Sequence, residues 1–145
     1  MYDIWKKQAI NELEMYEANI QAQANISDQI RELEAALTSI RSPGADSERV
    51  RVGSAGKDDR YLNNITAREL LKENLASTKK SIRRVERSLD IMSDEERIIL
   101  RRFFIAPEKK AADRLAGDLR VDVKTVYFKR DAALRKFTVA MYGKH

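Results

Sequence analysis

Residues 111–137 have the sequence AADRLAGDLRVDVKTVYFKRDAALRKF, which predicts two helices joined by a short turn. The apolar side of the first helix comprises Leu115, Ala116 and Leu119. The second helix would bury a stripe at steps of three, four and seven, formed by Val126, Ala133, Leu134 and Phe137. Asp122 stands where an N-cap belongs, with its carboxylate placed to accept hydrogen bonds from N–H groups two or three residues later.

The residues in front of this pair predict one more helix. Ser93-Asp94-Glu95-Glu96 has the pattern of a capping box and would open a helix that extends to about Ile105. Pro107 suits the first turn of the next helix, which we place at 107–119, and the last helix then covers 122–141. Three short helices, the last of them basic, have the layout of a helix-turn-helix domain over 93–145, and we expect its last four residues to fray.

The composition favours long solvated helices. Charged residues make up 35% of the 145 residues, whereas there are only five glycines and two prolines. The chain has no cysteine, which excludes disulfides and thiolate metal sites. It also has no apolar run of eighteen residues and no signal-peptide pattern at its N-terminus. We therefore expect an all-α, cytoplasmic protein without a membrane partner.

The whole excess of positive over negative charge lies in the C-terminal third. Residues 1–92 hold 15 Lys/Arg and 15 Asp/Glu, whereas residues 93–145 hold 13 Lys/Arg and 8 Asp/Glu. This asymmetry assigns polyanion binding to the C-terminal third. The alternative is that solvated helices are often slightly basic, and charge alone does not separate the two.

Residues 1–92 predict two long helices at about 3–41 and 62–91. The first has apolar residues on one face at Trp5, Ala9, Leu13, Tyr16 and Ile20, and then a coiled-coil seam at Ile26, Ile30, Leu33, Leu37 and Ile40. Between Ala18 and Ala24 the register is blurred, which predicts a stutter or a curve. The second helix has a seam at Leu71, Leu75, Thr78, Ile82, Val85, Leu89 and Met92.

The connection at 42–60 is rich in Ser, Gly and Asp, and we expect a mobile loop. Its single apolar alternation, Val50-Arg51-Val52, would otherwise form the edge of a small hairpin.

Two seamed helices joined by one loop predict a long antiparallel helical hairpin over 1–92. Pairing the seams brings Leu13 near Leu89, so Ile4, Trp5 and Ile10 would pack on the C-terminal helices. The same seams could instead form a homodimer. A cationic cluster outside the second seam is most simply a solvated face, with a second phosphate contact as the alternative; it comprises Lys79, Lys80, Arg83, Arg84 and Arg87.

The outer face of the last helix offers side chains that suit DNA. Base edges would be read near its N-terminus by Val123, Lys124, Tyr127 and Phe128. Phosphates would be met by Lys109, Lys110, Arg114, Arg130 and Arg135. The alternative is an ordinary solvated helix, with Tyr127 or Phe128 buried against the long helices.

Catalysis finds little support in this sequence. The only histidine is the terminal His145, no Gly-rich loop follows a strand, and no nucleophile–base pair can be assembled. Carboxylates are scattered over helical faces as charge partners. We therefore expect neither an enzyme nor a metal or other cofactor.

Several segments together resemble a known family. These are Ser93–Arg97 with the following Ile-Ile-Leu, Leu115-Ala116, Asp122–Tyr127 and Arg130–Phe137. They are similar to region 4 of bacterial sigma factors, and more so to the ArpU/RinA-type phage late-gene transcriptional regulators. In that family the turn usually contains Gly, where this chain has Arg120, so the turn is expected to be strained or differently shaped.

The resemblance implies a phage or prophage transcriptional regulator that acts on double-stranded DNA in a bacterial host cell. It favours activation of transcription, but the sequence itself does not separate an activator from a repressor. It implies that the helical hairpin contacts RNA polymerase or sets the oligomeric state. It places the exposed recognition positions at Val123, Lys124, Tyr127 and Phe128 and the N-cap at Asp122. Two other functions remain open: a DNA-packaging component like a small terminase subunit, and a helical protein-interaction adaptor.

Overall fold

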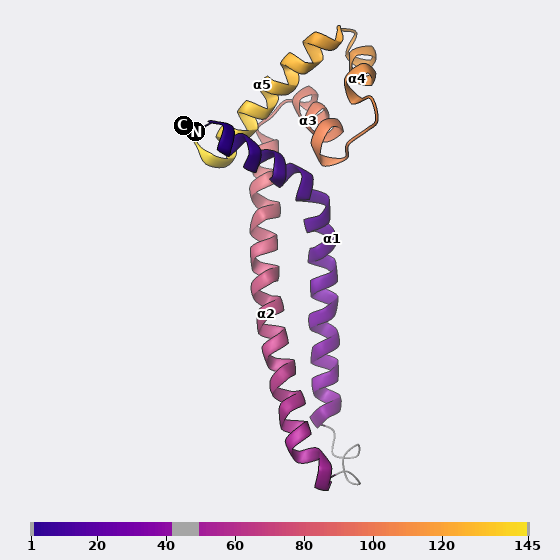
Figure 1. Cartoon of the computed structure of the whole chain (residues 1–145), viewed down its shortest axis with the longest axis vertical. Helices are drawn as coiled ribbons and strands as arrows, with labels where there is room; N and C mark the ends of the chain where they lie inside the picture. The colour runs from indigo at the N-terminus through magenta and orange to yellow at the C-terminus, as the bar shows by residue number, and fades with distance from the viewer. Residues whose placement is uncertain (1, 42–49, 145) are drawn as a thin grey trace. The chain divides into compact units, whose positions relative to one another are not determined.

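The computed structural model describes residues 2–41 and 50–144, and within those ranges all regular secondary structure is helical (Figure 1). The prediction of an all-α protein is therefore confirmed. The elements are α1 (Tyr2–Arg41), α2 (Val50–Asp90), α3 (Asp94–Leu100), the π-helical turn η1 (Arg101–Ile105), α4 (Ala111–Leu119) and α5 (Val123–Tyr142).

The chain forms two compact units. Unit 1 comprises Met1–Ile20 and Lys80–His145, and unit 2 comprises Gln21–Lys79. Both long helices contribute to both units, so the units do not follow the expected boundary at residue 92. In α1 the division falls inside the segment Ala18–Ala24, where the apolar register is blurred.

Helix α2 begins earlier than the sequence predicted. It starts at Val50, so residues 50–60 are helical and are neither a loop nor a hairpin edge. The sequence from 50 to 90 contains no proline, and glycine costs a helix only about 1 kcal/mol per residue without breaking it. The rest of the predicted loop, residues 42–49, lies outside the described residues.

Unit 2 is a pair of helical segments that run side by side in opposite directions (Figure 1). Ile30 and Asn64 are buried in it. The Asn64 side-chain amide donates to the Leu33 carbonyl at 2.7 Å, and its Oδ1 accepts from the Arg68 guanidinium at 3.0 Å. Because a buried amide is costly unless its partners are in place, Asn64 favours one register of the two helices.

The main core of unit 1 surrounds the second half of α5. Its buried residues are Ala9 and Leu13 of α1, Val85 of α2, Met92, Leu100 of α3, Ile105 of η1, and Ala133, Leu134 and Phe137 of α5. The predicted seam positions Val85 and Met92 are thus buried, as is Leu13 on the predicted apolar face of α1, and they pack with the C-terminal helices. Phe137 and Leu13 are fully enclosed.

A second cluster fixes α4 against α3 and the start of α5. Its buried residues are Ile99, Ala112, Leu115 and Val126. The helix predicted over 93–105 is regular only to Leu100 and then widens into η1. Across this segment Ile99 and Phe103 belong to the second cluster, whereas Leu100 and Ile105 belong to the main core. One short segment thereby joins both clusters.

The N-terminal residues pack on the C-terminal helices in part as predicted. The Trp5 ring lies on the Tyr142 ring with 5.0 Å between centroids, and Ile10 packs against the main core. Ile4 is exposed, so its predicted contact is wrong; its side chain lies on the outer face of α1. Tyr142 was expected to fray but is the last residue of α5, where it packs against the main core and faces the Trp5 ring.

Candidate nucleic-acid interface

The start of α5 is set by its N-cap. Asp122 has an extended backbone (φ −78°, ψ 165°), and its carboxylate accepts a hydrogen bond from the Thr125 N–H at 2.8 Å. Hydrogen bonds from the Thr125 side chain and N–H lower the pKa of Asp122. The predicted N-cap is confirmed, and it fixes the direction in which the first two turns of α5 point.

Those two turns have one buried side and one exposed side. Val126 is completely buried, whereas Val123, Lys124, Tyr127 and Phe128 are exposed. Phe128 is the extreme case, with 74% of its surface accessible. The four residues predicted to read bases therefore share one outward surface, and the alternative in which Tyr127 or Phe128 is buried is not observed. We call these four residues the α5 surface.

Tyr127 is held at the edge of this surface by Arg130. The guanidinium carbon of Arg130 lies 4.9 Å from the Tyr127 ring centroid and 5.2 Å from that of Phe103. The Asp131 carboxylate accepts from Arg130 at 2.9 and 3.1 Å. The Arg130 side chain is only 28% exposed, so it is engaged within the fold. Arg130 was predicted to meet phosphate; its geometry suits positioning Tyr127 instead.

The cations predicted at the start of α4 differ in their surroundings. Lys109 and Lys110 precede α4, which begins at Ala111 and not at Pro107, because Lys110 adopts a left-handed conformation (φ 56°, ψ 40°). Both lysines are exposed, and neither has an ion pair within residues 2–41 and 50–144. They are therefore available to an external anion.

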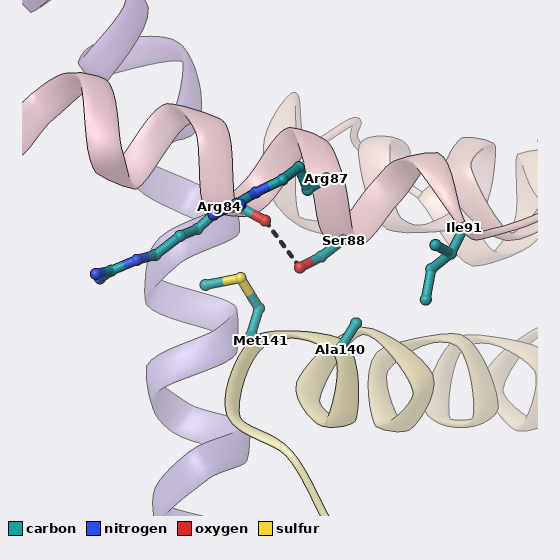
Figure 2. Close-up of a pocket in the computed structure, with 6 residues that line it drawn as sticks. All are labelled: Arg84, Arg87, Ser88, Ile91, Ala140 and Met141. Atoms are coloured by element: carbon teal, nitrogen blue, oxygen red, sulfur yellow. Dashed lines mark hydrogen bonds between the residues drawn. The ribbon is translucent and has the colours of Figure 1, made fainter.

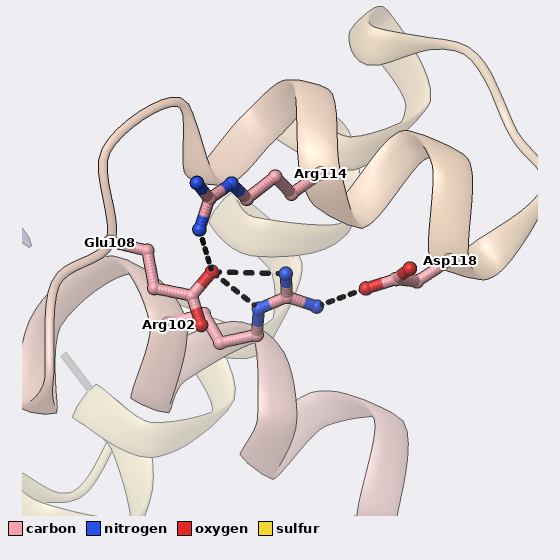
Figure 3. A network of polar contacts seen from close by, with 4 residues as sticks. All are labelled: Arg102, Glu108, Arg114 and Asp118. Carbon is pink, nitrogen blue, oxygen red and sulfur yellow. Dashed lines mark hydrogen bonds and ion pairs between the residues drawn. The ribbon is translucent and has the colours of Figure 1, made fainter.

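Arg114 belongs to a network that ties η1 to α4 (Figure 3). The Arg102 guanidinium donates to Glu108 at 3.0 and 3.1 Å and to Asp118 at 2.6 Å, and these carboxylates raise its pKa. The Arg102 side chain is 17% exposed, whereas that of Arg114 is 61% exposed and lies 3.9 Å from Glu108. Arg102 thus links η1 to α4 through Glu108 and Asp118, whereas Arg114 stays accessible to solvent.

Two further arginines, Arg135 and Arg120, are exposed on α5 and in the turn before it. Arg135 is exposed on the outer side of α5, farther from its N-terminus than the α5 surface. Arg120 is exposed in the turn between α4 and α5 and was not predicted as a contact. The sequence feature that could have identified Arg120 is its position, one residue after the end of α4 and two residues before the N-cap.

Arg120 occupies the turn in a left-handed conformation, φ 57° and ψ 45°. Its N–H donates to the Ala116 carbonyl, as does the N–H of Val121 at 3.1 Å. The turn therefore has the geometry that glycine accommodates best, and a Cβ at this position adds strain. This agrees with the expectation of a strained turn.

Three other observations bear on function. Among residues 2–41 and 50–144 no group of histidine, cysteine or carboxylate side chains is arranged to hold a metal ion. In the same ranges no helix has the length and apolar character needed to cross a membrane. We found no matching family model, and no curated protein or solved structure that is significantly similar to this chain.

Proposed function

We propose that this chain binds double-stranded DNA with the α5 surface and thereby regulates transcription. The observation that carries the proposal is the contrast within two helical turns: Val126 is buried, while Val123, Lys124, Tyr127 and Phe128 face outward directly after a short turn and an N-cap. A short, fixed helix end with exposed side chains is what the major groove admits.

Each side chain would have a distinct task. Lys124 would donate to the N7 and O6 acceptors of guanine, and Val123 and Phe128 would contact thymine methyl groups. Tyr127 would be held in place by Arg130. Phosphates would be met by Lys109, Lys110, Arg114, Arg120 and Arg135, which orient the domain without reading sequence.

The family resemblance extends the proposal. It favours a phage or prophage regulator, an activator, acting in a bacterial cell with RNA polymerase as a partner. Should the chain bind as a homodimer, its target would have half-sites about 34 Å apart, one helical turn, or a multiple of that distance.

One observation favours a second function. A phenylalanine exposed to the extent of Phe128 has no hydrogen-bonding group for a base, and aromatic side chains are enriched in protein–protein interfaces. A helical adaptor that presents α5 to another protein is therefore the second candidate.

Fluorescence anisotropy with duplex DNA across a salt series tests the first proposal. Random duplexes and fragments of the source genome are titrated with wild type and with Lys124→Ala/Tyr127→Ala. We expect a genome fragment to bind about tenfold or more tightly than random DNA, and the double variant to lose that preference. Because Lys124 would contact a base and not a phosphate, the double variant should leave the log–log salt slope nearly unchanged.

Lys72→Ala is the matched control, because Lys72 is an exposed lysine of unit 2, whereas the α5 surface belongs to unit 1. It should leave both affinity and preference unchanged. Equal binding of all DNA would point to a packaging or architectural protein. Absence of binding at low salt would refute DNA binding and leave the adaptor.

A further inference from the structure

A second basic surface lies on the C-terminal part of α2, within unit 1. Lys80, Arg83, Arg84 and Arg87 line one groove, at spacings that place all four on the same side of the helix. All four are exposed. Lys80, Arg84 and Arg87 form no ion pair with any other described residue. We call these four residues the α2 basic strip.

The strip borders an apolar groove between α2 and α5. Figure 2 shows Ser88 and Ile91 pointing toward Ala140 and Met141 of α5, with Arg84 and Arg87 alongside. Ile91 is 62% exposed. The Ser88 hydroxyl donates to the Arg84 carbonyl at 2.8 Å, so it already has a partner. The groove therefore offers apolar surface and cations, with little need for further hydrogen bonds.

We infer that this groove binds an acidic amphipathic helix of a partner protein. The strip runs from Lys80 to Arg87, which are seven residue steps apart, so it is about 10 Å long and matches two turns of an opposing helix. Carboxylates on one side of that helix would face Lys80, Arg84 and Arg87. Leucine-like side chains on the adjacent side would cover Ile91 and Met141.

The apolar half of the groove is the reason to prefer a protein over DNA. A DNA backbone would use the cations and leave Ile91, Ala140 and Met141 exposed, whereas an amphipathic helix uses both halves. Met141 also lies about 25 Å along α5 from Lys124, from the rise per residue of a helix. A helix bound here would leave the α5 surface accessible, so the inference goes beyond the proposed DNA binding and does not depend on it.

Binding of a synthetic helix to the full chain tests the inference. The probe is a fluorescein-labelled peptide of about five turns, with Glu on one side and Leu on the adjacent side. The control peptide has the same composition in scrambled order. Anisotropy titrations compare wild type with Arg84→Glu/Arg87→Glu and with Ile91→Ser, which alters no charge.

We expect the charge reversal to weaken peptide binding at least about tenfold, and Ile91→Ser to weaken it about fivefold. Arg31→Glu/Lys72→Glu makes the same change of charge on exposed side chains of unit 2 and should bind the peptide like wild type. Far-UV circular dichroism and the fluorescence of Trp5, the only tryptophan, verify that each variant is folded.

Three results would overturn the inference. In the first, Arg84→Glu/Arg87→Glu binds the peptide as wild type does, or the scrambled peptide binds equally well. In the second, this variant loses affinity for duplex DNA while Ile91→Ser changes neither ligand, which assigns the strip to DNA. In the third, light scattering shows a dimer that the charge reversal dissociates, which makes a second copy of the chain the occupant.

Discussion

Units 1 and 2 share the same two long helices but differ in how many helices meet. In unit 1 the ends of α1 and α2 join α3, η1 and α5 around fully enclosed side chains such as Phe137 and Leu13. In unit 2 only α1 and α2 are present, and Ile30 and Asn64 are its buried residues among those described. Two helices alone cover only one side of each other, so unit 2 has little core.

Charge follows the same division. Residues 1–20 and 80–145 hold 19 Lys/Arg and 14 Asp/Glu, whereas residues 21–79 hold nine of each. The excess cations therefore belong to the unit that has the core. A binding surface needs rigid support, and the residues of both proposed interfaces belong to unit 1, which has the larger core.

The largest expected difference between the two units comes from removing one buried side chain from each. Phe137→Ala should lower the free energy of unfolding of unit 1 by about 3–5 kcal/mol, because it leaves a cavity in the main core. Ile30→Ala should lower the free energy of unfolding of unit 2 by about 2 kcal/mol or less, because fewer side chains pack around Ile30 than around Phe137.

Urea unfolding separates the two effects. Trp5 fluorescence reports unit 1 alone, whereas far-UV circular dichroism reports the helices of both units. Phe137→Ala should shift the fluorescence transition, and Ile30→Ala should shift mainly the dichroism. A fluorescence transition that moves equally in both variants would show that the units unfold as one.

The next largest effect is expected at the contact of the N-terminus with α5. Trp5→Ala removes the stack on Tyr142 and should lower the free energy of unfolding by about 2 kcal/mol. Ile4→Ala is the control, because Ile4 is exposed and its removal should have almost no effect. Thermal unfolding by circular dichroism measures both; equal melting temperatures for Trp5→Ala and wild type would exclude a stabilising contact.

Features set by neighbouring residues were predictable from the sequence. The capping box of Ser93 and Glu96 and the N-cap Asp122 are confirmed, because each depends on side chains within three residues of the helix start. The buried stripe of α5 is also confirmed, since helical periodicity directly reports which side is apolar.

Features set by tertiary packing were not predictable from the sequence. The π-helical turn η1 lets neighbouring side chains pack into both hydrophobic clusters, and no local sequence pattern predicts it. Among the candidate contacts, Arg130 looked like any exposed arginine on an outer face, but its position depends on Phe103, which is distant in sequence. Ile4 was assigned a contact from an alignment of seams, which does not determine how α1 is rotated near its end.

Acid provides a smaller and selective perturbation of unit 1. The Ser93 N–H donates to Glu96 at 2.9 Å, and this bond lowers the pKa of Glu96 below its ordinary value. A lowered folded-state pKa stabilises the fold above the unfolded-state pKa, and the contribution is lost as pH falls through the folded-state value. Glu96→Gln should cost about 0.5–1 kcal/mol at pH 6 and less at pH 3.

Glu95→Gln makes the same change of charge one residue earlier and keeps the capping pair. Its loss of stability between pH 6 and pH 3 should resemble that of wild type. Urea unfolding monitored by Trp5 fluorescence measures this loss. An undiminished pH dependence in Glu96→Gln would assign the acid sensitivity to other carboxylates.

The smallest effect is a gain in stability at the turn before α5. Arg120→Gly relieves the left-handed backbone at φ 57° and should stabilise unit 1 by about 0.5 kcal/mol, net of the extra freedom of glycine in the unfolded chain. Arg114→Gly, in the middle of α4, should instead destabilise it by about 1 kcal/mol. Urea unfolding by Trp5 fluorescence measures both, and a loss of stability in Arg120→Gly would contradict the strain. A salt-dependent DNA titration of Arg120→Gly then tests the proposed phosphate contact. If this variant is more stable than wild type but binds DNA less tightly, Arg120 contributes to DNA binding and lowers the stability of the turn.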